Sequence, residues 1–108
     1  MRISITAEKS LINELKTAID KEPDNRVEKV EAAKDQTELA FGIGEILTII
    51  SVIKGVSSLV EILMKLKDKF GAKTQKLHLK TSLGTAVIEI SQDITPEQLR
   101  QQLATIMS

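Results

Sequence analysis

The one histidine of this chain is the residue best suited to acid-base chemistry. His78 lies in the alternating segment Lys76-Leu77-His78-Leu79-Lys80, and histidine is the side chain that most often acts as a general base near neutral pH. The alternation places both leucines on the core side of a strand, so we expect His78 to face away from the core with the two lysines. The sequence places no acid or nucleophile beside it. A surface position on a strand is therefore the favoured interpretation.

A short glycine-containing segment begins like a nucleotide-binding loop. Phe41-Gly42-Ile43-Gly44 has the first two glycines of a dinucleotide fingerprint, but the third would stand at position 47, which is Leu47. A strand leading directly into the segment is also missing from the pattern. We interpret it as a hinge and expect no bound nucleotide.

Acidic residues and histidine are too sparse or wrongly placed for a metal site. Asp20, Glu22 and Asp24 are spaced like the first ligands of a calcium loop, but the glycine that such a loop needs at its sixth position is replaced by Asn25. With one histidine and no cysteine, a multi-ligand zinc site is nearly excluded as well. We expect no metal, no cofactor and no catalytic residues, and hence a protein that is not an enzyme.

Composition favours one globular domain with an aliphatic core. The 108 residues suit a single domain over 1–108, and 42% of them are hydrophobic and 28% charged. Trp, Tyr and Cys are absent, and Phe41 and Phe70 are the two aromatic residues. The first residues lack the apolar run and cleavage site of a secretory signal. A cytoplasmic location, with association to a membrane surface as an alternative, is the expectation.

Charge is unevenly distributed although the formal net charge is zero. Residues 14–45 carry nine acidic and five basic side chains, whereas residues 65–80 carry six lysines against Asp68. Such asymmetry can steer a partner or attract an anionic membrane. Because Phe70 is the one Phe, Tyr or Trp among these lysines and the total charge is zero, we do not expect nucleic-acid binding. A solvated lysine-rich face is the favoured interpretation.

The elements that must position any site follow the order β-α-β-α(α)-β-β-α. Apolar alternation predicts strands over 2–7, 76–80 and 85–91, and a strand is preferred over 26–33. Helical spacing predicts a helix that Ser10 caps and that ends before Pro23. Thr95-Pro96-Glu97-Gln98 predicts a capping box that opens the last helix.

These elements predict an α+β fold with a four-stranded mixed sheet and helices largely on one face. The strands over 2–7 and 26–33 are joined through a helix, so we expect them to run parallel. The short turn at Ser82-Leu83-Gly84 predicts that the last two strands form a hairpin.

The apolar stretch from Ile43 to Met64 is the most informative feature. Thirteen of its twenty-two residues are large and apolar, and we predict a helix with a kink or break at Lys54-Gly55. Charges at Glu45, Lys54 and Glu61 argue against a membrane-spanning helix. Two interpretations stay open: a buried central helix, or a partly exposed apolar patch for self-association or a partner.

Several stretches along nearly the whole chain also carry a resemblance to a known family. They are Arg2-Ile3-Ser4-Ile5, Lys21-Glu22-Pro23, Asp24 to Ala32, Lys54-Gly55, Ser58-Leu59-Val60-Glu61, Lys65-Leu66-Lys67, Leu77 to Leu79 and Val87 to Ile90. In this order the chain resembles the effector-associated constant component family, which comprises small α+β proteins of bacterial conflict systems. The resemblance implies a non-enzymatic partner of an effector, commonly a caspase-like or trypsin-like peptidase, that relays a signal or assembles a complex.

We therefore expect an adaptor or regulatory module of a bacterial defence or programmed-cell-death system. Its apolar helical face would bind the effector, with Leu59, Val60, Leu63 and Lys65 as the partner contacts, and homo-oligomerisation is a further expectation. The alternative is a membrane-associated effector whose 43–64 helix inserts into lipid.

Overall fold

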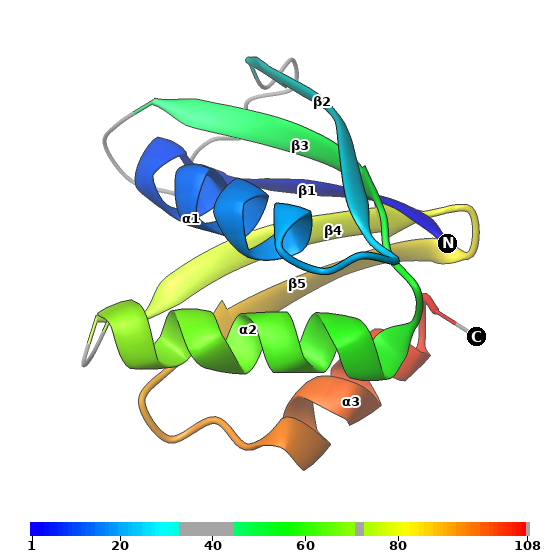
Figure 1. Cartoon of the computed structure of the whole chain (residues 1–108). Helices are drawn as coiled ribbons and strands as arrows, with labels where there is room; N and C mark the ends of the chain where they lie inside the picture. The colour runs from blue at the N-terminus through cyan, green and yellow to red at the C-terminus, as the bar shows by residue number, and fades with distance from the viewer. Residues whose placement is uncertain (33–44, 71–72, 108) are drawn as a thin grey trace.

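Alternating strands and amphipathic helices build the computed structural model, which describes residues 1–32, 45–70 and 73–107 (Figure 1). The bounds of the described elements are, in chain order, β1 Arg2–Glu8, α1 Lys9–Asp20, β2 Arg26–Ala32, β3 Ile46–Val52, α2 Val56–Phe70, β4 Gln75–Thr81, β5 Gly84–Ile90 and α3 Pro96–Ala104. The α+β class is confirmed. The sheet of this described part has five strands rather than the four predicted, because an additional strand, β3, lies within the apolar stretch.

The strands are arranged in the order β2-β3-β1-β4-β5, and every neighbouring pair is antiparallel. Helix α1 connects β1 to β2 across β3, and α2 connects β3 to β4 across β1. The first six elements thus form the β-α-β-β-α-β arrangement called ferredoxin-like. Strands β1 and β2 do run in the same direction, as predicted, but β3 separates them. The predicted mixed sheet is wrong for this reason: no described neighbours are parallel.

The predicted long helix is corrected most strongly. Residues Ile46–Val52 form β3, and α2 begins only at Val56, so the break falls at the predicted Lys54-Gly55. The run from Ile46 to Ile53 is rich in Ile, Val and Thr, whose branched β-carbons suit a strand better than a helix. A short apolar run of this kind does not reveal by its period which of the two it forms.

All three described helices lie over one face of the sheet, as predicted, with α2 between α1 and α3 (Figure 1). The buried hydrophobic residues of the described part are aliphatic, as the composition predicted. The largest fully buried side chains are Ile3, Ile5, Leu11, Ile12, Leu15, Ile19, Ile49, Ile53, Leu59, Ile62, Leu63 and Leu77. The opposite sheet face carries the other set of alternating side chains, including Thr6 and Thr48, whose hydroxyl oxygens lie 2.8 Å apart.

Of the two predicted N-terminal helix caps, the one at α3 is confirmed and the one at α1 is wrong. At α3, the Gln98 backbone N–H donates to Thr95 Oγ1 at 3.2 Å and the Thr95 N–H donates to Gln98 Oε1 at 3.0 Å, so the predicted capping box is present. At α1, the N-cap residue is Glu8 rather than Ser10, and no side chain caps the helix. Strand β1 runs directly into α1, which leaves no loop for a cap.

Turn geometry explains the hairpin between β4 and β5. Thr81 pairs with Gly84, and Gly84 has φ +151°, a backbone conformation that L side chains rarely adopt. The predicted hairpin is confirmed. The prediction that the glycine-containing segment 41–44 is a hinge lies outside the described residues.

Candidate functional site

The apolar face of α2, predicted to bind a partner, is turned into the core. Leu59, Val60 and Leu63 are at most 3% exposed. They are enclosed because α2 lies between α1 and α3 and over the sheet (Figure 1). Of the two interpretations left open for the apolar stretch, burial in the core is the one observed for these three side chains.

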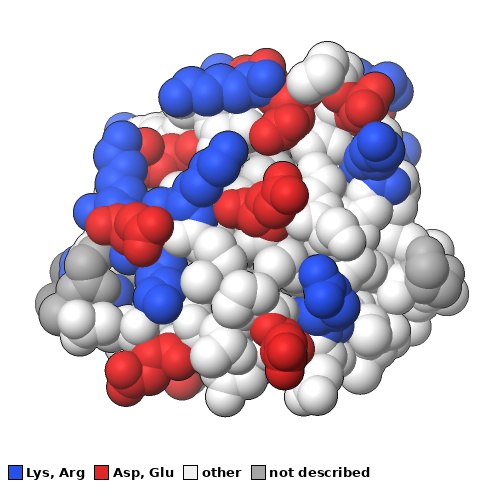
Figure 2. Space-filling view, turned by 60° about the horizontal axis from the view of Figure 1, so that its bottom comes forward, with Lys and Arg blue, Asp and Glu red and all other residues white. Residues whose placement is uncertain are grey.

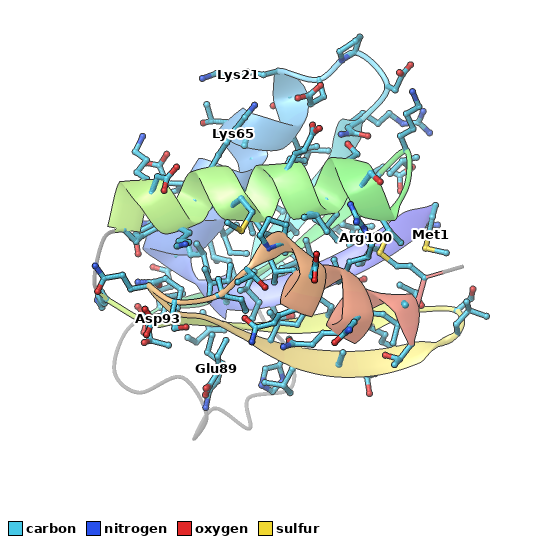
Figure 3. The ribbon with its side chains drawn as sticks, turned by 90° about the horizontal axis from the view of Figure 1, so that it is seen from below. Met1, Lys21, Lys65, Glu89, Asp93 and Arg100 are labelled. Atoms are coloured by element: carbon cyan, nitrogen blue, oxygen red, sulfur yellow. The ribbon has the colours of Figure 1, made fainter. Side chains whose placement is uncertain are left out.

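Lys65 is the one predicted contact residue that solvent reaches. Its side chain is exposed, and its Nζ lies 3.9 Å from Glu22 Oε1. Figure 3 shows Lys65 on the side of α2 that points toward α1. An exposed ion pair of this kind contributes only about 0–1 kcal/mol, so Lys65 can exchange its partner at little cost.

A recess lies beside this lysine, where the turn between α1 and β2 faces the start of α2. It has a volume of about 550 Å³, and we call it the α2 recess. Its lining residues are Glu22, Pro23, Asp24, Asn25, Lys54, Gly55, Val56, Ser57, Ser58 and Glu61. One wall is the turn around Pro23 that follows α1, and the other is the Lys54-Gly55 segment between β3 and α2. Both walls are therefore segments where regular structure is interrupted.

Asn25 fixes the floor of the α2 recess. The side chain is only 6% exposed, its Oδ1 accepts a hydrogen bond from the Lys54 backbone N–H at 2.7 Å, and its Nδ2 donates to Ser58 Oγ at 2.7 Å. One amide thus joins the α1–β2 turn to the end of β3 and to the first turn of α2. A buried amide with both ends bonded holds its surroundings in one geometry.

The rim of the α2 recess carries charges of both signs. Lys54 Nζ lies 3.5 Å from Asp24 Oδ2, with both side chains mostly exposed, and Glu22 and Glu61 add further carboxylates. The first turn of α2 adds the partial positive charge of a helix N-terminus. Because carboxylates surround that helix end, the recess does not favour a phosphate. It offers hydrogen-bond donors and acceptors side by side, which suits a polypeptide.

The predicted lysine-rich stretch is not one basic patch. Lys69 Nζ lies 2.8 Å from Glu14 Oε1 on α1, Lys76 pairs with Glu89 across the β4–β5 hairpin, and the Lys67 ammonium donates to the Ile94 carbonyl oxygen. Figure 2 shows basic and acidic side chains intermixed on the face that it presents. The acidic first third and the basic later stretch therefore neutralise each other in part within the fold.

His78 faces away from the helix-covered core, as the alternation predicted. It lies on β4 opposite Thr6 of β1 and Val87 of β5, between the buried Leu77 and Leu79. Across the described ranges, no three His, Cys, Asp or Glu side chains gather in a group that could hold a metal ion. Among those same residues, no helix has both the length and the apolar character needed to cross a membrane.

No protein-family model matches the chain, and comparison with curated proteins and with solved structures found no match either. The resemblance to the effector-associated constant component family therefore stays a prediction.

The α2 recess was missed as a site because its key residue makes contacts that are remote in sequence. Asn25 lies in a turn and replaces the glycine that a calcium loop needs at its sixth position, and both properties are local. Its bonds to Lys54 and Ser58 span 29 and 33 residues, a separation that no local spacing rule covers. The sequence features that could have indicated the recess were the two positions that interrupt regular structure, Pro23 and Lys54-Gly55.

Proposed function

We propose that this chain is a non-enzymatic adaptor or regulatory module that binds another protein through the α2 recess and the adjoining Lys65. The observation that carries the proposal is the combination of a buried, doubly bonded Asn25 floor with an exposed rim of mixed charge. The resemblance adds the expected partner, an effector such as a caspase-like or trypsin-like peptidase of a bacterial conflict system.

Geometry of the recess supports a peptide segment as the bound group. A volume of about 550 Å³ is large enough for a few side chains of a partner. The floor is held in place before binding, which lowers the ordering cost of association. At the rim, the Lys54–Asp24 pair is exposed and the Lys65–Glu22 pair is partly exposed, so both are weak and a partner's charges can replace either member.

Membrane insertion is not carried forward as an alternative. It required residues 43–64 to form one helix, whereas Ile46–Val52 is a strand that is hydrogen-bonded on both sides, to β1 and to β2. Extracting this interior strand would separate β2 from the rest of the sheet. The contact surface proposed here is also polar rather than apolar, because the apolar side of α2 is used by the core.

A charge-reversing double variant tests the proposal. Ser57→Arg with Glu61→Arg places two long cations at the recess, and both native side chains are exposed. The matched control is Gln101→Arg with Glu97→Arg, which makes the same charge change at exposed positions of α3. Tagged proteins are produced in the native host, and co-purifying proteins are quantified by mass spectrometry.

We expect an effector protein that the wild type and the control variant retain equally and that the recess variant loses at least about tenfold, the equivalent of 1.4 kcal/mol. Far-UV circular dichroism checks that all three proteins are folded. Equal retention by both variants would show that the recess is not the contact surface and would overturn the proposal.

A further inference from the structure

The two edges of the sheet differ in how they are protected against pairing with another strand. Strands β2 and β5 are the edges, and the outer backbone N–H and C=O groups of an edge strand are a template for a further strand. Natural proteins block such edges with charged residues, above all lysine, with proline, or with a β-bulge.

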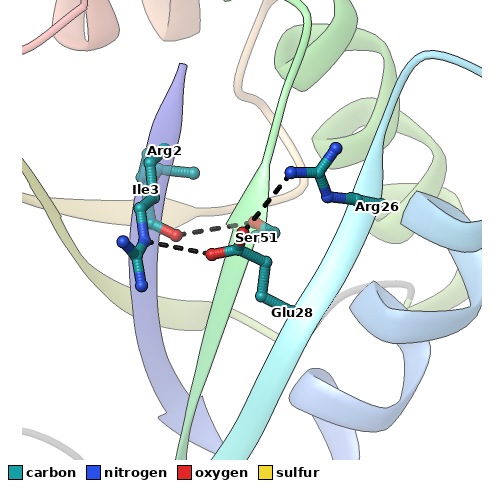
Figure 4. Close-up of polar contacts among 5 residues, drawn as sticks. All are labelled: Arg2, Ile3, Arg26, Glu28 and Ser51. Atoms are coloured by element: carbon teal, nitrogen blue, oxygen red, sulfur yellow. Dashed lines mark hydrogen bonds and ion pairs between the residues drawn. The ribbon is translucent and has the colours of Figure 1, made fainter.

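Edge strand β2 is well protected. Its register against β3 shifts between Val27 and Lys29, which is a bulge or irregularity that bends an edge. Glu28 at this irregularity lies 3.0 Å from Arg2 and 3.5 Å from Arg26, so it links β2 to β1 across β3 (Figure 4). A second β2 centred on the midpoint of the strand would set Lys29 against Lys29. Strand β2 therefore resists pairing with a copy of itself.

Edge strand β5 has only one of these devices, the charged residue Glu89. Residues 84–90 contain no lysine, arginine or proline, and they pair with β4 in unbroken register from Gln75↔Ile90 to Thr81↔Gly84. Val87 at the centre of the strand and Leu83 in the adjoining turn are each 55% exposed. They are the two most exposed large hydrophobic residues of the described part of the chain. Figure 3 shows Glu89 of this strand pointing away from the helices.

Strand β5 is also complementary to itself. In an antiparallel pair of two β5 strands centred on Val87, Val87 faces Val87 of the second copy and Thr85 faces Glu89. Branched apolar side chains opposite each other stabilise a strand pair, and no like charges are directly opposed. The carboxylate of Glu89 already lies 3.5 Å from Lys76 Nζ, so its charge is balanced on its own chain.

We propose that β5 pairs antiparallel with β5 of a second copy of this chain, about a two-fold axis at Val87, so that two sheets join into one. Such an isologous contact closes on itself and leaves no further β5 edge exposed. The α2 recess lies at the β2–β3 side, and β1 and β4 separate it from β5. Pairing therefore leaves both recesses open, and the dimer presents two of them to a partner. This inference does not depend on the proposed adaptor function.

The test is the molar mass of the protein in solution, by light scattering with refractive-index detection because Trp and Tyr are absent. We expect a mass of twice 11.9 kDa for the wild type at high concentration. Val87→Lys places an ammonium group against its own copy and should weaken the dimer at least tenfold. Val30→Lys, an equal change at an exposed position of β2, should leave the dimer intact. A wild type that is monomeric at every concentration, or dissociation by Val30→Lys alone, would overturn the proposal.

A cross-linking variant keeps the test decisive if Val87→Lys fails to fold. The chain contains no cysteine, so Val87→Cys introduces a single thiol directly opposite the thiol of the second copy. We expect mild oxidation to convert this variant to a covalent dimer, whereas Val30→Cys stays largely monomeric on a denaturing gel. Equal cross-linking of the two variants would contradict pairing through β5.

Discussion

Replacing Asn25 with alanine should destabilise the domain well beyond the effect of an ordinary turn substitution. The change removes the acceptor for the Lys54 backbone N–H and the donor to Ser58 Oγ, both at 2.7 Å, at a position only 6% exposed. Each lost hydrogen bond costs about 0.5–1.5 kcal/mol, and a backbone donor left buried without a partner raises its own share to about 1–3 kcal/mol. Ser58 is half-buried and can bond to water instead, so we expect a total of about 2–3 kcal/mol.

Urea unfolding followed by far-UV circular dichroism measures this loss. An equivalent reading is a fall of roughly 10–20 °C in Tm, since about 1 kcal/mol corresponds to about 4–8 °C in a domain of this size class. The matched control is Asn13→Ala, the same substitution at an exposed position of α1, which should be neutral or slightly stabilising. A loss for Asn25→Ala no larger than that of the control would refute the bridging role of this amide and the preformed floor of the recess.

Substitutions at three further positions test a core residue, a surface residue and a helix cap. Leu63→Ala should lower the free energy of unfolding by about 2–5 kcal/mol because the side chain is fully buried. No change in urea unfolding would contradict a core position for this residue. Lys65→Ala should change stability by less than about 1 kcal/mol, since its pair with Glu22 is exposed; a larger loss would mean the pair is shielded. Thr95→Ala should cost about 1 kcal/mol through the lost cap of α3, and Thr95→Ser, which keeps the hydroxyl, should restore most of it in thermal melts.

Features with a local cause were predictable from the sequence. The alternation in Arg2–Glu8 and in Gln75–Thr81 identifies strands whose two faces differ in polarity, and both strands are present. Thr95 and Gln98 make a capping box three residues apart, so their bonds involve no distant chain segment. The outward orientation of His78 follows from the same period of two. Each of these depends on neighbours within one turn or one strand.

The stretch around β3 shows where local patterns stop being informative. Its residues from Ile46 to Ile53 are nearly all apolar, so neither a period of two nor one of 3.6 stands out. The insertion of β3 between β1 and β2 uses pairs such as Arg2↔Val52 and Val27↔Ser51, which join residues far apart in the chain. The prediction of one helix over β3 and α2 assigned the apolar side chains of both elements to a single helical face. That error produced the predicted contact surface of Leu59, Val60 and Leu63.

Sequence patterns were enough to predict the aliphatic core, the α+β class, the hairpin, the break at Lys54-Gly55 and the cap of α3. The strand order, the burial of the apolar side of α2 and the contacts of Asn25 with Lys54 and Ser58 are visible only in the folded chain. The physical reason is that side-chain periodicity defines the faces of an element but does not specify which neighbour covers each face. That choice is made by long-range strand pairing and helix packing, whose energies depend on all the elements at once. In this fold, helix packing over the sheet buries the face of α2 that the sequence predicted as a binding surface. The polar α2 recess and the β5 edge stay exposed.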